Sequence, residues 1–481
     1  MYNITLIDIF NILFFVYGSI IILLYIITAI LAVSELNKYL SRNRHFDFNA
    51  LLYFESLPGI TIVAPAYNEE RTIIQNISGL LNLKYSDFEI IVVNDGSKDN
   101  SLEKVIEFFD LVKTNVYYDM KIPTAEVRCI YKSRNKAFNH LTIVDKVNGG
   151  KSDALNTGLN LAKKELFLAL DVDCIIESDA LLRMVKPFLE ESERECIATG
   201  SVIRVANSCE IVNGQIKKIN YPKNLWAKFQ VLEYFRAFTL GRMAWKGING
   251  LLIISGAFGM FNRKRALAVG GYDTNTVGED LEIVVRMRRY MHDVEKKKYC
   301  VSFIPDPICW TEVPESLRIL SRQRKRWTRG AIETIRKHKS IFMNPQYKVS
   351  GLVSFPNLVL FEWLAPIIQF IGFVYVIFMT IFGLINTQTF LILLLFVISF
   401  ALMYSFFGVF YEAYTYNKYK GTGYLLKAFV VAFFETLMYQ PLNMYFAIIG
   451  NYDSFFRKKT KNKWGDMTRK GFEKQKKHSD L

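Results

Sequence analysis

Long apolar runs divide the chain into membrane and soluble parts. Ile9 to Val33 contains no charged residue, and three further apolar blocks cover 351–383, 389–412 and 424–450. About 20 apolar residues in a helix cross the hydrocarbon core of a bilayer, so the first run is long enough. A cleaved signal peptide is the competing interpretation, but it needs a basic start, a shorter apolar run and a small-residue cleavage site. None of these is evident, and we expect an uncleaved anchor.

Between the first and second apolar runs, short apolar segments alternate with segments of helical spacing. The pattern holds from Pro58 to about Pro307. The expected strands cover 60–64, 88–93 and 166–170, and the expected helices 72–83 and 102–109. Strands alternating with helices indicate an α/β fold with a mostly parallel, doubly wound sheet. Ligands of such sheets bind beyond the carboxyl ends of the strands, where this chain places its polar clusters.

These patterns predict six segments along the chain. They are an N-terminal transmembrane helix (1–34), a connector (35–57), an α/β domain (58–310), interfacial amphipathic helices (311–350), a C-terminal transmembrane region (351–452) and a basic tail (453–481).

The formal net charge is +15, and the excess basic residues lie beside the apolar runs. Lys38, Arg42 and Arg44 follow the first run, whereas the residues before it carry only Asp8. The positive-inside rule therefore predicts that the N-terminus is outside and residue 40 onward is in the cytoplasm. We expect a multi-pass protein of the cell (inner) membrane. Nucleic-acid binding is the rival interpretation of this charge. We expect membrane lipid and no nucleic acid as the partner, because the clusters flank membrane segments.

The three C-terminal blocks raise a question of parity. A cytoplasmic domain and a cytoplasmic tail require an even number of crossings between them. The first block contains Pro356 and Pro366, and the third contains Glu435 and Pro441. We expect one of these two blocks to be bent, re-entrant, doubled or partly interfacial.

Cysteine and histidine usage argues against a zinc enzyme. The six cysteines are scattered without a CxxC motif, and no pair among the five histidines has zinc-ligand spacing on a helix. We expect buried thiols in a reducing compartment.

Paired carboxylates end the predicted strand 166–170. Asp171 and Asp173 lie at i and i+2, so their side chains point the same way from an extended segment. Mg²⁺ or Mn²⁺ prefers a few hard oxygen ligands, and such an ion neutralises a diphosphate leaving group. Asp-x-Asp is also common in turns, so the pair alone leaves both interpretations open.

Three other polar clusters are equally ambiguous when taken singly. Asp95 ends the strand 88–93 and could accept hydrogen bonds from a nucleobase, but Asn-Asp-Gly-Ser is also typical of a turn. Tyr67 could stack on a base or pack against the protein. Lys151, after two glycines, could reach a diphosphate or remain solvated.

Two clusters fall on predicted helices. Asp280 lies near a helix N-terminus, where it could be a general base or merely a favourable charge at the helix dipole. Gln323, Arg326 and Trp327 are three and four residues apart, so they share a helix face. Arginine suits a phosphate and tryptophan a sugar ring, although a basic amphipathic helix resting on lipid gives the same pattern.

The order and spacing of PAYNEE, VVNDGS, GGKSDALN, DVD, GED and QRKRW are more specific than any single motif. From about Pro58 to Gly330 the chain resembles the membrane-integrated, processive family 2 glycosyltransferases, which include hyaluronan, cellulose, chitin and poly-N-acetylglucosamine synthases. The resemblance implies a Rossmann-like GT-A nucleotide-sugar-binding domain inserted between transmembrane helices.

The resemblance also implies roles for individual residues. Tyr67, Glu69 and Asp95 would hold the uridine, Lys151, Asp171 and Arg326 would meet the diphosphate, and Asp171 with Asp173 would bind Mg²⁺ or Mn²⁺. Asp280 would be the catalytic base, with Gly256, Glu279, Gln323 and Trp327 at the acceptor. Trp464 and Arg469 resemble, more weakly, a gating segment that follows the last helix in such synthases.

The resemblance implies an inverting transfer from a UDP-sugar, first UDP-N-acetylglucosamine, to a growing glycan that is exported across the membrane. The motif reads GED where cellulose-type enzymes usually have TED, and no cyclic-dinucleotide-binding domain is evident after the last helix, so we do not expect a regulated bacterial cellulose synthase. A non-processive enzyme that adds one sugar to a lipid and a non-catalytic membrane scaffold stay as alternatives. Accessory export or modification subunits stay possible partners.

Overall fold

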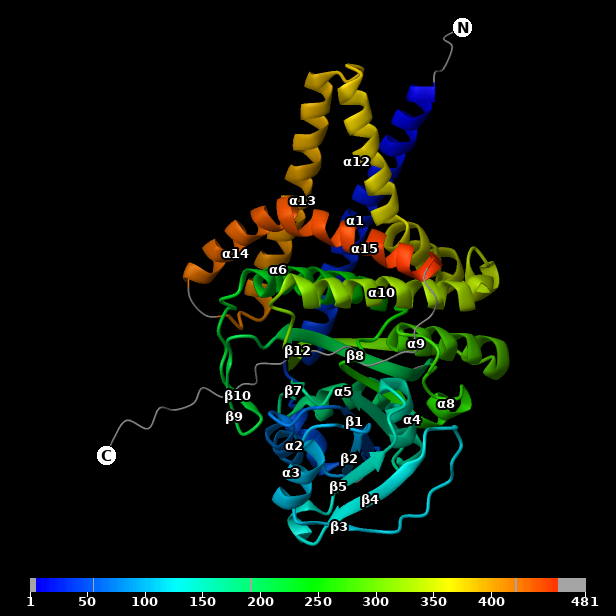
Figure 1. The fold of residues 1–481 in the computed structure, drawn as a ribbon, viewed down its shortest axis with the longest axis vertical. Helices are drawn as coiled ribbons and strands as arrows, with labels where there is room; N and C mark the ends of the chain where they lie inside the picture. The colour runs from blue at the N-terminus through cyan, green and yellow to red at the C-terminus, as the bar shows by residue number, and fades with distance from the viewer. Residues whose placement is uncertain (1–5, 55, 191–192, 420–421, 457–481) are drawn as a thin grey trace, which may run out of the picture.

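The computed structural model describes residues 6–54, 56–190, 193–419 and 422–456. Figure 1 shows three levels: an α/β body, a layer of helices lying across it, and three helices that project away from that layer. The α/β fold predicted from the alternating pattern is confirmed.

A ten-stranded sheet forms the body, in the order β3-β4-β5-β2-β1-β6-β11-β8-β12-β7. The strands are β1 (Ile60–Ala66), β2 (Phe88–Asn94), β3 (Leu111–Lys113), β4 (Val127–Ser133), β5 (Leu141–Lys146), β6 (Leu166–Leu170), β7 (Ile175–Ile176), β8 (Glu195–Val205), β11 (Phe258–Asn262) and β12 (Tyr299–Thr311), and β9 (Glu210–Val212) pairs with β10 (Gln215–Lys218) apart from it. The central strands β5, β2, β1 and β6 run parallel.

The prediction of a mostly parallel sheet is wrong for the rest of the sheet, although β12 runs parallel to β8. β11 runs antiparallel to both β6 and β8, and β4 is antiparallel to β3 and β5. The sheet is therefore mixed. An apolar run shows that a strand is buried, but it carries no information about the direction in which the strand joins the sheet.

Several helices connect the strands and pack against the sheet. They are α2 (Ile73–Leu81), α3 (Ser101–Phe108), α4 (Lys151–Leu161), α5 (Ala180–Leu189), α8 (Arg263–Ala268) and α9 (Glu279–Tyr290). Between the body and the apolar helices lie α6 (Leu225–Tyr234), η3 (Phe235–Arg242), α7 (Met243–Gly247) and α10 (Leu317–Lys337).

Within the described residues, four helical segments are long and apolar enough to cross a membrane, judged by length and composition. Three are the projecting helices α1 (Leu6–Asn43), α12 (Ala365–Ile381) and α13 (Thr387–Thr415). The segment that ends in α12 begins with three short helical elements, η7 (Ser350–Ser354), α11 (Phe355–Asn357) and η8 (Leu358–Trp363). The fourth comprises α14 (Thr422–Phe434), η9 (Glu435–Tyr439) and α15 (Gln440–Phe456). Figure 1 shows that this fourth segment, which we name the transverse arm, lies across the other three and over α10.

Buried ion pairs join the transverse arm and α13 to the body. Arg204 of β8 pairs with Glu412 of α13, and both side chains are 1% exposed. Arg236 of η3 pairs with Glu435 of the arm and also donates to the Ser405 hydroxyl. Because a buried ion pair broken on one side is costly, these contacts fix the apolar helices relative to the sheet.

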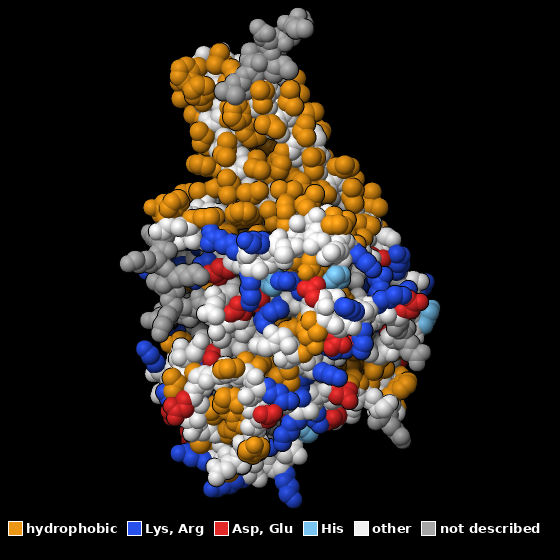
Figure 2. Space-filling model, turned by 90° about the vertical axis from the view of Figure 1, so that its right-hand side faces the viewer, with side chains coloured by type: hydrophobic (Ala, Val, Ile, Leu, Met, Phe, Trp, Pro, Cys, Tyr) orange, Lys and Arg blue, Asp and Glu red, His pale blue; other side chains and the backbone are white. Residues whose placement is uncertain are grey.

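Figure 2 shows apolar side chains covering the projecting helices and the layer beneath them, with Lys and Arg gathered just below that apolar band. Exposed residues such as Phe15, Phe373 and Phe396 belong to the band. An apolar surface of this extent is typical of contact with lipid.

Candidate active site

A cavity of about 820 Å³ lies between the carboxyl edge of the sheet, the N-terminus of α9, and α10. Most of the residues selected from the motifs line it: Glu69, Lys151, Asp171, Asp173, Gly256, Glu279, Asp280, Gln323, Arg326 and Trp327. It continues to Pro366 in α12 and Ala447 in α15. The cavity therefore extends from the strand ends to the apolar helices, and its volume suits a ligand larger than one sugar.

Lys151, the first residue of α4, lies among carboxylates on one side of the cavity. Its Nζ is 2.5 Å from Asp171 Oδ1 and 3.6 Å from Glu279 Oε1, and it donates to the Gly256 carbonyl at 3.1 Å. Burial disfavours the charged form of the lysine, but Asp171 and Glu279 outweigh it and raise the pKa of Lys151. Lys151 is thus a firmly charged group next to Asp171.

Asp173 is buried beside Asp171 just beyond β6. Burial, reinforced by the negative charge of Asp171, raises the pKa of Asp173 to about 7. Asp171 and Asp173 thus place two carboxylates side by side, an arrangement of negative charge that a cation would stabilise. This donor set fits a hard divalent ion. The part of the chain that the structure describes contains no group of three or more His, Cys, Asp and Glu side chains that could hold a metal. Mg²⁺ commonly keeps several waters and binds through one or two carboxylates and substrate phosphates.

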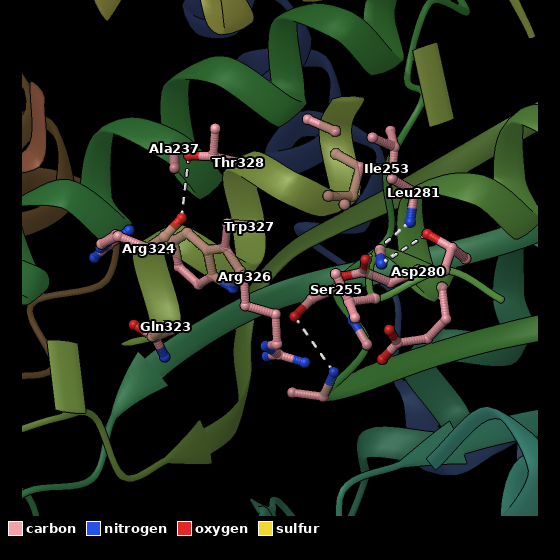
Figure 3. Close-up of a pocket in the computed structure, with 18 of the residues that line it drawn as sticks. Ala237, Ile253, Ser255, Asp280, Leu281, Gln323, Arg324, Arg326, Trp327 and Thr328 are labelled. Carbon is pink, nitrogen blue, oxygen red and sulfur yellow. Dashed lines mark hydrogen bonds between the residues drawn. The ribbon is translucent and has the colours of Figure 1, made fainter. Parts of the chain in front are cut away.

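Asp280 lies in the first turn of α9, as its sequence position predicted. Its Oδ2 accepts a hydrogen bond from the Gly256 amide at 3.1 Å, and its Oδ1 accepts one from the Leu281 amide at 2.9 Å. Figure 3 shows this carboxylate at the cavity wall, bound to the loop that precedes β11. The two amides hold Asp280 in one orientation while it still lines the cavity.

The start of α9 is packed directly on α10 through two glycines. A Cβ added to Gly278 would lie 2.8 Å from the Cα of Gly330, and one added to Gly330 would lie 2.6 Å from the Cα of Gly278. Only glycine at both positions permits this approach. It brings Asp280 close to the face of α10 that carries the QxxRW residues.

Gln323, Arg326 and Trp327 share the cavity face of α10, as the helical spacing predicted. Figure 3 shows the Arg326 side chain extending from α10 toward Ser255, with Trp327 next to it on the same helix. The indole of Trp327 is 41% exposed, and the Oε1 of Gln323 is buried without a hydrogen-bond partner. The face therefore presents a cation, an amide and an open aromatic surface to one space.

Asp95 does not line the cavity. Its carboxylate is wholly buried, and its Oδ1 accepts hydrogen bonds from Lys146 Nζ at 2.8 Å and from the Gly149 amide at 2.9 Å. Its Oδ2 accepts from the Gly150 amide at 2.8 Å. This geometry supports the loop that presents Lys151. Tyr67, just after β1, also lies outside the lining of the cavity, and direct contact of either residue with a nucleoside stays a prediction.

Several residues that line the cavity were not predicted from the sequence. Arg242 of η3 lines the cavity, where burial lowers the pKa of its guanidinium to about 10 although Asp280 opposes the shift. Glu233, Glu362 and Trp363 line it as well. None of these residues belongs to a motif, and only packing of distant segments brings them to the site. The two residues assigned to gating, Trp464 and Arg469, lie outside the described residues.

The chain resembles known proteins over most of its length. The family model described as "Glycosyltransferase like family 2" matches residues 58–330. The poly-beta-1,6-N-acetyl-D-glucosamine synthase of Staphylococcus epidermidis is 28% identical over 330 residues, which is 68% of each chain. The synthase of the same name from Staphylococcus aureus (strain COL) is 26% identical over 343 residues, which is 71% of each chain.

One solved structure supports the fold. It is the mannosyltransferase PcManGT from Pyrobaculum calidifontis in complex with GDP-Man and Mn²⁺, with a TM-score of 0.50 and 16% identity. The match covers 91% of this chain and 100% of that chain. At this identity the likeness concerns the GT-A-like fold alone.

Proposed function

Because this chain belongs to glycosyltransferase family 2, we propose that it synthesises a polysaccharide by inverting transfer from a UDP-sugar to the end of a growing glycan. One observation carries the proposal: a single cavity gathers Lys151, the Asp171–Asp173 pair, Asp280 and the QxxRW face. UDP-N-acetylglucosamine is the first candidate donor, because the curated relatives are named poly-β-1,6-N-acetylglucosamine synthases.

In this proposal the donor occupies the strand-end side of the cavity. Lys151 and Arg326 are the cations that would bind its diphosphate, and Arg326 adds a planar fork of donors. Glu69 lines the same side and, with Tyr67 and Asp95 next to it in the fold, would hold the nucleoside directly or through the loop. The proposed catalytic domain covers 58–310.

Asp171 and Asp173 would hold Mg²⁺ or Mn²⁺. A bound divalent ion supplies neutralisation of the diphosphate as it leaves. Lys151 holds a positive charge at Asp171 and keeps that carboxylate turned toward the cavity.

Asp280 would take the proton of the acceptor hydroxyl. Its two backbone hydrogen bonds keep the carboxylate in place for that transfer. The acceptor sugar would lie between Asp280 and Trp327, with the indole as an apolar platform and Gln323, Glu279 and Gly256 around it. Attack from this side, opposite the leaving diphosphate, gives inversion at the sugar carbon.

The arrangement of apolar helices supports a membrane topology with three crossings. In our proposal α1, α12 and α13 cross, with the N-terminus outside, while the transverse arm lies in the interface on the side of the catalytic domain. The crossings between domain and tail are then two, which satisfies the parity that the basic flanks demand. The cavity reaches Pro366 and Ala447, a direction in which the glycan would leave.

Purified protein with a panel of UDP-sugars and Mg²⁺ or Mn²⁺ tests the proposal. We expect UDP release together with a product ladder whose mass increases by one sugar per step. A product with a single added sugar would support the alternative of a lipid or other single-transfer acceptor. Absence of UDP release with every donor would contradict both, and would favour a scaffold.

A further inference from the structure

A buried ionic cluster lies next to the proposed acceptor platform. Arg324 belongs to α10 and is three residues before Trp327, so both side chains share one side of the helix. The guanidinium carbon of Arg324 is 4.1 Å from the centroid of the Trp327 ring. Arg324 is 7% exposed, in contrast to Trp327, which is 41% exposed and lines the cavity. One part of the tryptophan is thus covered by a buried cation, and the rest is open to the cavity.

Two other elements hold the guanidinium in place. Arg324 donates from Nη1 to Glu233 Oε1 at 2.7 Å and from Nη2 to Glu233 Oε2 at 2.6 Å. Its Nη2 also donates to the Tyr439 hydroxyl at 2.8 Å, and that hydroxyl donates to Glu233 Oε2 at 2.7 Å. A two-point pair between arginine and a carboxylate fixes the plane of the guanidinium as well as its position.

The cluster connects the transverse arm to the cavity. Glu233 belongs to α6, whereas Tyr439 belongs to η9 of the arm and is wholly buried. Near the same place α15 touches α10 closely, because a Cβ added to Gly450 would lie 3.0 Å from the Cβ of Thr328. The arm therefore contacts α10 twice, through Tyr439 at Arg324 and through Gly450 at Thr328.

We propose that Arg324 is a positioning residue that fixes the Trp327 indole for the acceptor sugar, and that Glu233 and the transverse arm hold it through Tyr439. The proposal rests on the proposed function, in which Trp327 carries the acceptor's terminal sugar. An exposed indole otherwise samples several rotamers, and a stacked cation restricts them. Lysine keeps the charge but cannot form the two-point pair, so it should not replace Arg324.

The first test needs no turnover. The fluorescence of each protein is measured with increasing acrylamide, and the signal of the same protein carrying Trp327→Phe is subtracted. The remaining signal gives the quenching of Trp327 alone. Arg324→Lys should raise this quenching, and Tyr439→Phe should raise it less, because it removes only the hydroxyl. Arg329→Lys is the matched control, since Arg329 pairs with Glu333 on the same helix and lies outside the cavity lining. Equal quenching in wild type and Arg324→Lys would overturn the proposal.

The second test uses the KM for a β-1,6-linked N-acetylglucosamine oligosaccharide. Arg324→Lys should raise this KM about tenfold, the scale of a lost cation–aromatic contact, and leave the donor KM within about twofold. In a Trp327→Ala background the same change should have no further effect on UDP-release kinetics. Independent, multiplicative effects of the two changes would contradict the positioning role.

These readouts separate the inference from the function on which it rests. A wild-type protein that releases no UDP would refute the proposed function, while the quenching series would still decide whether Arg324 orders Trp327. If Arg324→Lys lowers the yield of folded protein, Glu233→Gln takes its place, because it keeps the size of the side chain and weakens the same pair. Its quenching and KM are read by the same criteria.

Discussion

The ammonium of Lys151 lies 2.5 Å from the Oδ1 of Asp171, at the point where β6 ends and the cavity begins. The positively charged ammonium of Lys151 thus lies beside the proposed metal-binding pair.

Replacing either carboxylate of the pair should impair the reaction. Asp171→Ala and Asp173→Ala should each reduce turnover by at least about 10²-fold, because a diphosphate then leaves without charge neutralisation.

UDP release measured over a titration of Mg²⁺ and Mn²⁺ checks this expectation, with Asp119→Ala as control, since Asp119 is 76% exposed and outside the cavity lining. Full activity in excess EDTA would contradict a metal role.

Asp280→Asn should separate binding from chemistry. The change keeps the shape of the side chain and the hydrogen bond from the Gly256 amide, but it removes the charge that accepts a proton. Turnover should fall about 10²- to 10⁴-fold, the usual contribution of a general base, while donor affinity changes little. Calorimetry of UDP-sugar binding beside a turnover assay measures both. If the variant turns over at the wild-type rate, Asp280 is only a charge at a helix N-terminus.

Trp327→Ala and Arg326→Ala should differ in effect. Loss of the indole should abolish polymer but leave slow donor hydrolysis, with water in place of the acceptor. Loss of Arg326 should abolish both, because its proposed partner is the diphosphate. Polymer length, UDP release and the yield of extracted protein are measured for each variant. Arg318→Ala is the control, because Arg318 is exposed on α10 outside the cavity lining. A shared loss of folded protein in both variants would favour α10 as a lipid anchor alone.

Asp95→Asn should lower stability as well as donor binding. Asp95 and Lys146 are both fully buried, and neutralising Asp95 leaves Lys146 with Asp153, 2.6 Å from its Nζ, as its remaining carboxylate partner, so the expected cost is about 1–3 kcal/mol. Asparagine has one acceptor oxygen in place of two, so either the Gly149 or the Gly150 amide would lose its partner. Thermal unfolding and calorimetry of UDP-sugar binding test this together. Weaker binding at unchanged stability would instead favour direct contact with the nucleoside.

Cysteine labelling of intact cells tests the topology. Leu384 lies in the turn between α12 and α13 and is 52% exposed, so Leu384→Cys should react with a membrane-impermeant maleimide. Lys104→Cys, on α3 of the catalytic domain, should react only after the membrane is opened. The wild-type protein, with its own six cysteines, gives the background. Labelling of position 104 in intact cells would place the catalytic domain outside.

The sequence predicts the parts of the site that depend on short spacing. Asp171 and Asp173 follow a buried strand, and Arg326 and Trp327 share a helical face, because strand and helix periodicity act over a few residues. The direction of β11, the transverse course of α14 and α15, and the presence of Arg242 and Glu233 in the cavity depend on packing between distant segments. Periodicity carries no signal for that packing. For Asp95, the sequence predicts a position at the end of a strand. It does not predict that the loop of Gly149 and Gly150 buries the carboxylate.

The contact of Gly278 with Gly330 joins two backbones without an intervening side chain. The spacing between the residue proposed to take the proton and the proposed platform is therefore set by main-chain geometry. Substitutions elsewhere around the cavity can reshape the space for one sugar or another and leave that spacing alone. In the proposed function, a substitution around the cavity would change which sugar fits, whereas a side chain at Gly278 or Gly330 would change the distance between the base and the platform.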